Sequence, residues 1–239
     1  MNFSIKRISA TLITLLALSF IVFFHELGHY LACHAFGVPT PTFSVGFGPA
    51  LIQYKPQNTT FQIALIPLGG YVSIAAHELS QKPYWQKMII TLAGIFNNSL
   101  LAAVLLFFIF FSQEASSLTI ALNATLKKLK ELFKEFGGIF SPAYKRAKLM
   151  GPSEIITTTH QKFNESAAFF FLWLAVISIQ IGLFNLLPLP LLDGGQAVQI
   201  TAEALIHRDL TAQEIVFMHY AMVFFFISLI LLSQKKKTP

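Results

Sequence analysis

Two histidines and a glutamate with the spacing of a metal site lie near the N-terminus, in residues 24–29, Phe-His-Glu-Leu-Gly-His. On a helix, His25 and His29 are four residues apart and share one face, where two imidazoles can bind the same zinc ion. Glu26 lies beside them and can take a proton from a zinc-bound water, whose pKa the metal lowers towards neutrality. The resulting hydroxide would attack a peptide carbonyl. The motif supplies two ligands, so a third must come from elsewhere in the chain.

The segment around this motif is strongly apolar. Residues 8–24 contain no charged side chain, so the motif lies within or at the end of an expected membrane-spanning helix. The same motif on a polar surface helix is often coincidence. An ionised glutamate between two histidines is costly in lipid, however, and such groups rarely stand there without a function.

Asp193 is the candidate for the third ligand. It follows Pro188 and Pro190 in residues 185–195, Asn-Leu-Leu-Pro-Leu-Pro-Leu-Leu-Asp-Gly-Gly, where the prolines predict a break in a helix. Irregular backbone at membrane depth is tolerated only where protein or a watery cavity surrounds it. A carboxylate suits a zinc ion already bound by two imidazoles and leaves a fourth position for water. Taken alone, Asp193 would serve equally well as the cap of a helix that begins near Gly194.

Composition indicates a polytopic membrane protein rather than a soluble one. Hydrophobic residues make up 54% of the 239 residues and charged residues 12%, and the mean hydropathy is +0.62. The net charge of +6 does not indicate nucleic-acid binding, because the lysines and arginines lie mostly beside apolar segments, where they suit lipid headgroups. The single cysteine, Cys33, excludes an internal disulfide, and we interpret it as a packing residue of the helix.

The hydrophobic pattern predicts an all-α polytopic fold in a single domain over residues 1–239. A small β-hairpin is expected between the first two spans because apolar residues alternate there. Its edge would be either an ordinary connection or a strand against which an extended substrate pairs. The expected elements are spans at about 8–36, 88–111, 166–192 and 215–232, a hairpin region at 42–73, and an amphipathic insert at 112–148.

Two further features carry open alternatives. Asn97 and Asn98 lie within the second span, so at least one amide should face the bundle interior, to bond a neighbouring helix or to bind substrate. The insert contains a basic amphipathic helix, with apolar residues at helical spacing over residues 118–136. A position on the membrane surface fits this helix best, although packing on the bundle or on a partner protein would also bury its apolar face.

The chain resembles the site-2 proteases, a family of intramembrane zinc metalloproteases, and within it the bacterial branch that cleaves anti-sigma factors. The motifs that carry the resemblance occur in the family's order along most of the chain. They are residues 24–29, 46–49 (Gly-Phe-Gly-Pro), 66–72 (Ile-Pro-Leu-Gly-Gly-Tyr-Val) and 185–195, with weaker matches at 93–94, Asn98 and 151–152.

The resemblance implies a role for each matching residue. His25, His29 and Asp193 would hold one Zn²⁺ and Glu26 would activate water. Asn185, and more weakly Asn98, would bind substrate. The implied reaction is hydrolysis of a peptide bond within or near a transmembrane helix of another protein, which is regulated intramembrane proteolysis, and the hairpin would help to receive the unwound substrate.

The chain also departs from the family pattern. Members of that branch usually carry one or two PDZ domains between spans two and three, where this chain has roughly fifty residues, too few for a domain of about 80–100 residues. Ile95 stands where a proline is usual. Substrate selection is therefore expected to differ.

The expected location is a bacterial inner membrane, with the lipid bilayer and a transmembrane substrate as partners. Oligomeric state is not predicted. The resemblance implies an active site towards the cytosol, which places both termini and residues 112–165 outside. Those segments hold thirteen Lys and Arg residues and the other two connections hold four, so the positive-inside rule favours the opposite orientation. We adopt the orientation of the family, because an interfacial basic helix can keep its lysines at either headgroup layer.

Three other functions remain open from the sequence. The first is a catalytically silent membrane chaperone or regulator, although all expected ligands and the general base are present. The second is a metal transporter, which would not need Glu26. The third is a zinc protease that clips prenylated or signal-derived peptides.

Overall fold

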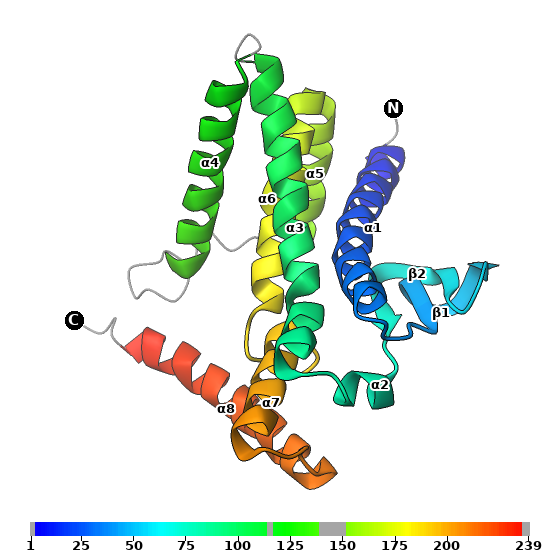
Figure 1. The fold of residues 1–239 in the computed structure, drawn as a ribbon. Coiled ribbons are helices and arrows are strands. Elements are labelled where there is room, and N and C mark those ends of the chain that lie inside the picture. Colours follow the sequence, from blue (N-terminus) through cyan, green and yellow to red (C-terminus); the bar gives the residue numbers. More distant parts are fainter. Residues whose placement is uncertain (1–2, 114–116, 139–151, 236–239) are drawn as a thin grey trace.

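The computed structural model describes residues 3–113, 117–138 and 152–235. In Figure 1, the helices α1, α3, α5 and α6 stand side by side, and the small sheet, α7 and α8 lie towards one end of them. The elements in chain order are α1 (Phe3–Ala35), β1 (Thr42–Tyr54), β2 (Thr60–Ser73), α2 (Ala76–Ser80), α3 (Tyr84–Gln113), α4 (Leu118–Gly138), α5 (Pro152–Glu165), α6 (Ala167–Asn185), α7 (Asp193–Ile206) and α8 (Ala212–Lys235).

Three helices of the described residues are long and apolar enough to cross a membrane. They are Ile8–Ala35 of α1, Tyr84–Ser112 of α3, and Ala167–Asn185, which is α6. A bilayer core requires about 20 apolar residues in a helix. In α8, the apolar section Ala212–Ser228 is shorter than that, so the predicted fourth span is not confirmed. The membrane-protein prediction is supported with three candidate spans instead of four.

The predicted break after the third span is present. Ser166 caps α6 at its start, where its side chain accepts a hydrogen bond from Phe169 N, and the helix ends at Asn185. The third span is therefore shorter than the predicted 166–192. Pro188 and Pro190 have no N–H to donate, so the chain leaves the helix and resumes one only at Asp193. This loop brings the start of α7 back to α1.

The α1 and α3 helices approach closely at small residues. A Cβ added at Gly28 would collide with the carbonyl of Ala93, and one added at Gly94 would lie 2.7 Å from atoms of the His25 ring. Asn97 Nδ2 donates a hydrogen bond to the carbonyl of Phe24. Only glycine fits where two helix backbones come this near, so the contact fixes α1 against α3 at the level of the histidine motif.

The sheet between the first two spans pairs β1 with β2 in more than one register. Ala50, Ile52, Gln53 and Tyr54 face Ala64, Ile63, Gln62 and Phe61 in antiparallel order, which is the predicted hairpin. The first residues of β1, 42–45, pair parallel with 60–63 and also antiparallel with 73–70. Both strands therefore bend, and the sheet is more folded than a simple hairpin.

The sheet packs on the side of α1 rather than beyond its end. Ser19 Oγ, in the apolar section of α1, donates to the carbonyl of Pro67 at 3.3 Å. The Tyr30 ring lies 5.8 Å from Phe43 and 5.5 Å from Phe61, between ring centroids. The sheet is thus anchored beside the candidate span at the level of the histidine motif.

The amphipathic insert forms helix α4, and Figure 1 shows it running alongside α3. Its buried Leu132 packs with Ala102 and Leu106 of α3 and Ile179 of α6, and Leu129 and Phe136 pack around them. The sequence favoured a position on the membrane surface, and the structure corrects this to the alternative of packing on the bundle, where Leu132 is buried among apolar side chains of α3 and α6. Residues 139–148 of the predicted insert lie outside the described residues.

Candidate metal centre

The α1 helix places His25 and His29 on one buried face, as their spacing predicts. Their Nε2 atoms lie 3.3 Å apart and their ring centroids 4.9 Å apart. The two side chains are 7% and 9% exposed. Both imidazoles therefore point the same nitrogen at one spot inside the protein, near the end of the first span.

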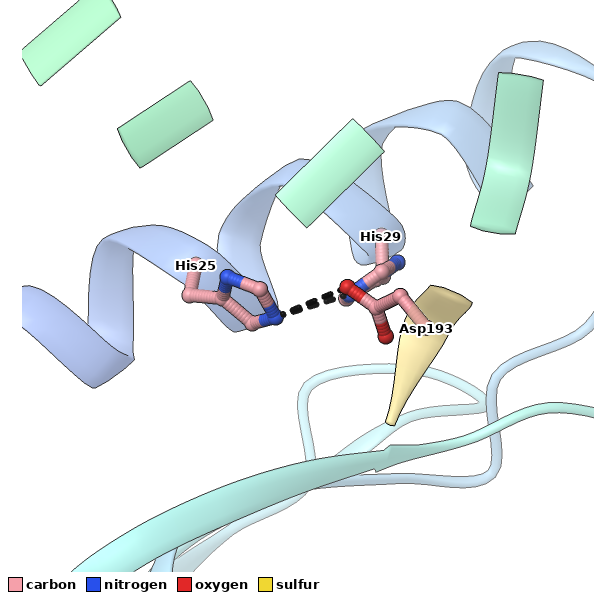
Figure 2. Close-up of side chains that lie close together, drawn as sticks. All are labelled: His25, His29 and Asp193. Atoms are coloured by element: carbon pink, nitrogen blue, oxygen red, sulfur yellow. Dashed lines mark hydrogen bonds and ion pairs between the residues drawn. The ribbon is translucent and has the colours of Figure 1, made fainter. Parts of the chain in front are cut away.

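Asp193, the first residue of α7, brings a carboxylate to the same spot (Figure 2). Its Oδ2 lies 3.2 Å from His25 Nε2 and 3.4 Å from His29 Nε2. The N-cap of α7 is Leu192, without a side-chain cap bond, so Asp193 does not serve as the helix cap. The capping alternative is therefore not supported, and Asp193 lies where it could act as a metal ligand with the two histidines.

These three atoms fit a tetrahedral metal ion. The edges of the triangle they form are 3.2, 3.3 and 3.4 Å. A tetrahedron with bonds of about 2.0–2.1 Å, as for zinc with nitrogen and oxygen ligands, has edges of about 3.3–3.4 Å. Asp193 Oδ2 is buried and has no ordinary hydrogen-bond donor among the described residues. Two imidazoles and one carboxylate are a usual catalytic zinc set that leaves a position free.

The backbone of α3 fixes the orientation of His29. The carbonyl of Ile90 lies 2.8 Å from His29 Nδ1, so this nitrogen carries the proton and donates it. Nε2 is then left with its lone pair towards Asp193 and His25. A carbonyl behind a ligating imidazole is a common way to hold its tautomer and ring direction. His25 Nδ1 is buried and has no such partner among the described residues.

Glu26 stands on the same side of α1, at the wall of a cavity of about 300 Å³. Val72 of β2 lines the same cavity. A Cβ added at Gly70 would lie 3.3 Å from Glu26 Cγ, so the sheet closes tightly over this side chain. The strand and the helix together hold the carboxylate beside the three ligand atoms, where a general base must stand.

The cavity joins the histidine motif, the sheet and the loop before α7. Its wall combines all four residues predicted for the metal chemistry with the strand 69–72 and with Asn185. The lining residues are Val22, His25, Glu26, His29, Gly69, Gly70, Tyr71, Val72, Ile74, Ile181, Asn185, Leu191, Asp193 and Gln196. Three of the four main motifs named from the sequence, 24–29, 66–72 and 185–195, thus contribute residues to this cavity wall.

The two predicted substrate-binding asparagines are placed differently. Asn185 lines the cavity, and its Nδ2 donates to the carbonyl of Ile181 at 3.0 Å, which leaves Oδ1 for another donor. Asn98 is fully buried and is absent from the cavity wall. A Cβ added at Gly182 of α6 would lie 3.1 Å from Asn98 Cβ, so Asn98 sits between α3 and α6. Asn98 therefore does not line the cavity, and its contact with substrate stays a prediction.

Sequence reasoning missed several contributors to the site. The carbonyl of Ile90 and the bare backbone at Gly94 both shape the imidazole pair, and Gln196 lines the cavity one turn after Asp193. The role of the Ile90 carbonyl could not be predicted, because every residue has a backbone carbonyl. Gly94 did give a signal, since a glycine inside an apolar helix indicates close packing, but the sequence does not show which group packs against it.

Comparison with known proteins places the whole arrangement in one family. The profile of "Peptidase family M50" matches residues 13–229. A protein named "Putative zinc metalloprotease" from Fusobacterium nucleatum is 40% identical over 104 residues, which are 40% of this chain and 31% of that protein. Proteins of the same name from Helicobacter pylori strain J99 and Thermotoga maritima are 32% identical over 166 residues (63% of this chain, 43% of that protein) and 39% identical over 107 residues (39% and 21%).

The matched segments cover less than half the length of each of these three relatives. The family profile, in contrast, extends over most of this chain and includes the histidine motif, the sheet and the loop that carries Asp193. By this match and by the geometry of the centre, the chain belongs to peptidase family M50, the site-2 protease family.

Proposed function

We propose that this protein is a zinc-dependent intramembrane protease that hydrolyses peptide bonds within or near transmembrane segments of other membrane proteins. One observation carries the proposal. The three ligand atoms, the Glu26 carboxylate and a free cavity lie together beside candidate membrane spans. A site of this kind has little use in a protein that only binds or scaffolds, because buried ionisable groups at membrane depth are costly.

Each residue has a distinct task in the proposed reaction. His25, His29 and Asp193 would hold one zinc ion, which supplies a Lewis acid and lowers the pKa of water. Glu26 takes the proton of the attacking water and returns it to the amine that leaves. The close packing of Gly70 against Glu26 Cγ holds this side chain at the cavity wall, where a general base can reach the water.

The strand 69–72 is the proposed support for the substrate. Residues 70–73 pair with 45–42 on one side, and residues 69–72 border the cavity. An extended segment could add to such an edge through main-chain hydrogen bonds. Asn185 Oδ1 would accept a further bond from the substrate backbone. A transmembrane substrate must therefore unwind near the cleavage point, and helix-breaking residues are expected there.

We also propose that the protein resides in a bacterial inner membrane with this site towards the cytosol. The support is family membership together with the three apolar helices. The silent chaperone and the metal transporter gain no support from the structure. Glu26 lines the same cavity as the three possible ligands, and neither of those functions requires a general base at that position.

The test is cleavage of tagged single-span substrates by the purified protein in liposomes, with zinc content measured for each variant. Glu26→Gln should retain zinc and lose about 10²–10⁴-fold in cleavage rate, since it removes the general base alone. Asp193→Ala should lose zinc as well. Glu154→Gln changes an exposed carboxylate on α5 and should behave as wild type.

Cleavage within the span by wild type and by Glu154→Gln, but not by Glu26→Gln, supports the protease. Equal rates for Glu26→Gln and wild type would remove the assignment of the general base. If the protein cleaves free signal-derived or prenylated peptides but does not cleave the single-span substrates, the result would favour the third alternative, a zinc protease that clips such peptides.

A further inference from the structure

The two imidazoles of the metal centre are not equally supported. His29 Nδ1 donates to the carbonyl of Ile90 at 2.8 Å. His25 Nδ1 is buried and has no hydrogen-bond partner among the described residues. A ligating histidine almost always donates its second ring N–H to a carbonyl, a carboxylate or a water. His25 therefore lacks the support that its neighbour has.

A second unpaired group lies in the same part of the bundle. Asn98 is 0% exposed, and neither its Nδ2 nor its Oδ1 has a partner in the part of the chain that the structure describes. Its backbone carbonyl is satisfied, because Ser178 Oγ of α6 donates to it at 2.9 Å. The side-chain amide is thus the unexplained group, and buried amides of native proteins nearly always have a partner, often an ordered water.

Position along α3 connects the two groups. Gly94 lies one helical turn before Asn98, and a Cβ added at Gly94 would lie 2.7 Å from both Cε1 and Nε2 of His25. Side chains of a helix tilt towards its N-terminus, so the Cα–Cβ bond of Asn98 is inclined along α3 towards the level of Gly94. The imidazoles of His25 and His29 pack directly against the α3 backbone at Gly94, one turn from Asn98.

The α6 helix packs against this part of α3. A Cβ added at Gly182 would lie 3.6 Å from Asn98 Nδ2. The neighbouring Ile181 and His25 line the same cavity. His25 and Asn98 therefore both border the junction of α1, α3 and α6, and they do not reach each other within hydrogen-bond distance.

We propose that Asn98 is a positioning residue for His25, acting through one buried water that accepts the proton of His25 Nδ1 and donates to Asn98 Oδ1. A water of this kind makes two to four hydrogen bonds and would satisfy both unpaired groups. The bond fixes the tautomer of His25 with Nε2 free for the metal, as Ile90 does for His29. This role rests on the proposed zinc site and replaces the substrate contact expected from the sequence.

The test compares Asn98→Leu with Asn98→Asp, two side chains of similar size. Leucine removes the hydrogen-bonding capacity, whereas aspartate keeps an acceptor oxygen. The zinc dissociation constant of each purified variant is measured by chelator competition, and its unfolding temperature is measured without metal. Asn98→Leu should weaken zinc binding by about 10–100-fold, and Asn98→Asp should stay within a few-fold of wild type.

Ser178→Ala is the matched control, because it removes a buried hydrogen bond to the backbone of Asn98 and leaves the side-chain amide of Asn98 unchanged. It should lower the unfolding temperature and leave the zinc dissociation constant unchanged. Wild-type zinc affinity in Asn98→Leu would overturn the proposal, and so would equal losses in the leucine and aspartate variants, which would indicate a packing role. Failure of wild type itself to bind zinc would overturn the proposed metal site together with this inference.

Discussion

The α3 helix presents two faces of different character. Towards α1 it offers backbone and polar groups: the carbonyl of Ile90, the bare Gly94 and the amide of Asn97. Towards α4 and α6 it offers Ala102 and Leu106, which pack in an apolar cluster. The first contact fixes individual atoms of the histidines, while the apolar cluster of the second buries hydrophobic side chains.

The difference between the two faces shows that side-chain orientation must be exact only at the contact with α1, where the histidines lie. Hydrogen bonds and backbone contacts define directions to within a few tenths of an ångström, as an imidazole ligand requires. Apolar packing tolerates exchange of one hydrophobic side chain for another of similar volume. Substitutions on the α1 face of α3 should therefore alter metal binding, and those on the α4 face should alter stability.

Gly94→Ala is the change expected to have the largest effect. The added methyl would lie 2.7 Å from His25 ring atoms, closer than packed atoms approach. We expect zinc affinity to fall by more than about 100-fold, beyond the usual effect of losing one supporting hydrogen bond. Chelator competition measures this. The control is Gly137→Ala on α4, where nothing lies within 4 Å of an added Cβ; equal zinc affinity in both variants would refute the comparison.

Leu132→Ala is the corresponding change on the other face. It removes a buried side chain from the cluster with Ala102 and Leu106, and the cavity should lower the free energy of unfolding by about 2 kcal/mol. Zinc affinity should stay at the wild-type value. Unfolding in detergent measures the first quantity, with Leu122→Ala, at a position 46% exposed, as the control. A large loss of zinc affinity would contradict the proposed independence of the two faces.

The smallest effect is expected at the surface, between α7 and α8. Arg208 bonds Glu214 and holds the pKa of that carboxyl down to about 2. Because the folded pKa lies below the unfolded one, the contribution to stability is present above about pH 4.5 and is lost as the pH falls towards 2. Water screens this exposed pair.

The protection factors for hydrogen exchange of residues 211–215, which correct for the intrinsic pH dependence of exchange, should therefore fall slightly between pH 4.5 and 2 in wild type. Glu214→Gln should show the lower protection already at pH 7, without change at the metal centre. If zinc were lost over the same pH range in which Glu214 is protonated, and Glu214→Gln had already lost it at pH 7, the α7–α8 junction would be coupled to the metal centre. That outcome would contradict the expectation for an exposed ion pair.

Several elements could be predicted from the sequence because their signals are local. The i, i+4 spacing of His25 and His29 predicts a shared helix face, and the prolines before Asp193 predict a break in the third span. Both are present. The amphipathic pattern also predicted α4 correctly as a helix. The favoured position of this helix on the membrane surface was wrong, and it packs against α3 instead. An amphipathic pattern shows that a helix has an apolar face, but it does not show which surface that face will cover.

Other features depended on contacts between distant residues. The second half of β2 pairs with the start of β1 and reaches Glu26, whereas alternation alone indicates only a hairpin. Asn97 and Asn98 look equivalent in the sequence, yet one bonds α1 and the other lies between α3 and α6. A difference of one residue turns a side chain by about 100° around a helix, so only the neighbouring helices decide its partner.

By itself, the sequence predicted the ligand types and the general base, and it located three apolar spans and the place where the third span breaks. These follow from residue chemistry and from periodicity along one segment. The tertiary structure alone decided that Asp193 meets the histidines at 3.2 and 3.4 Å, that Ile90 fixes only one of them, and that Asn98 is shut away from the cavity. The reason is that a metal site is a geometric relation between segments more than 160 residues apart, which is set by helix packing and not by any local pattern.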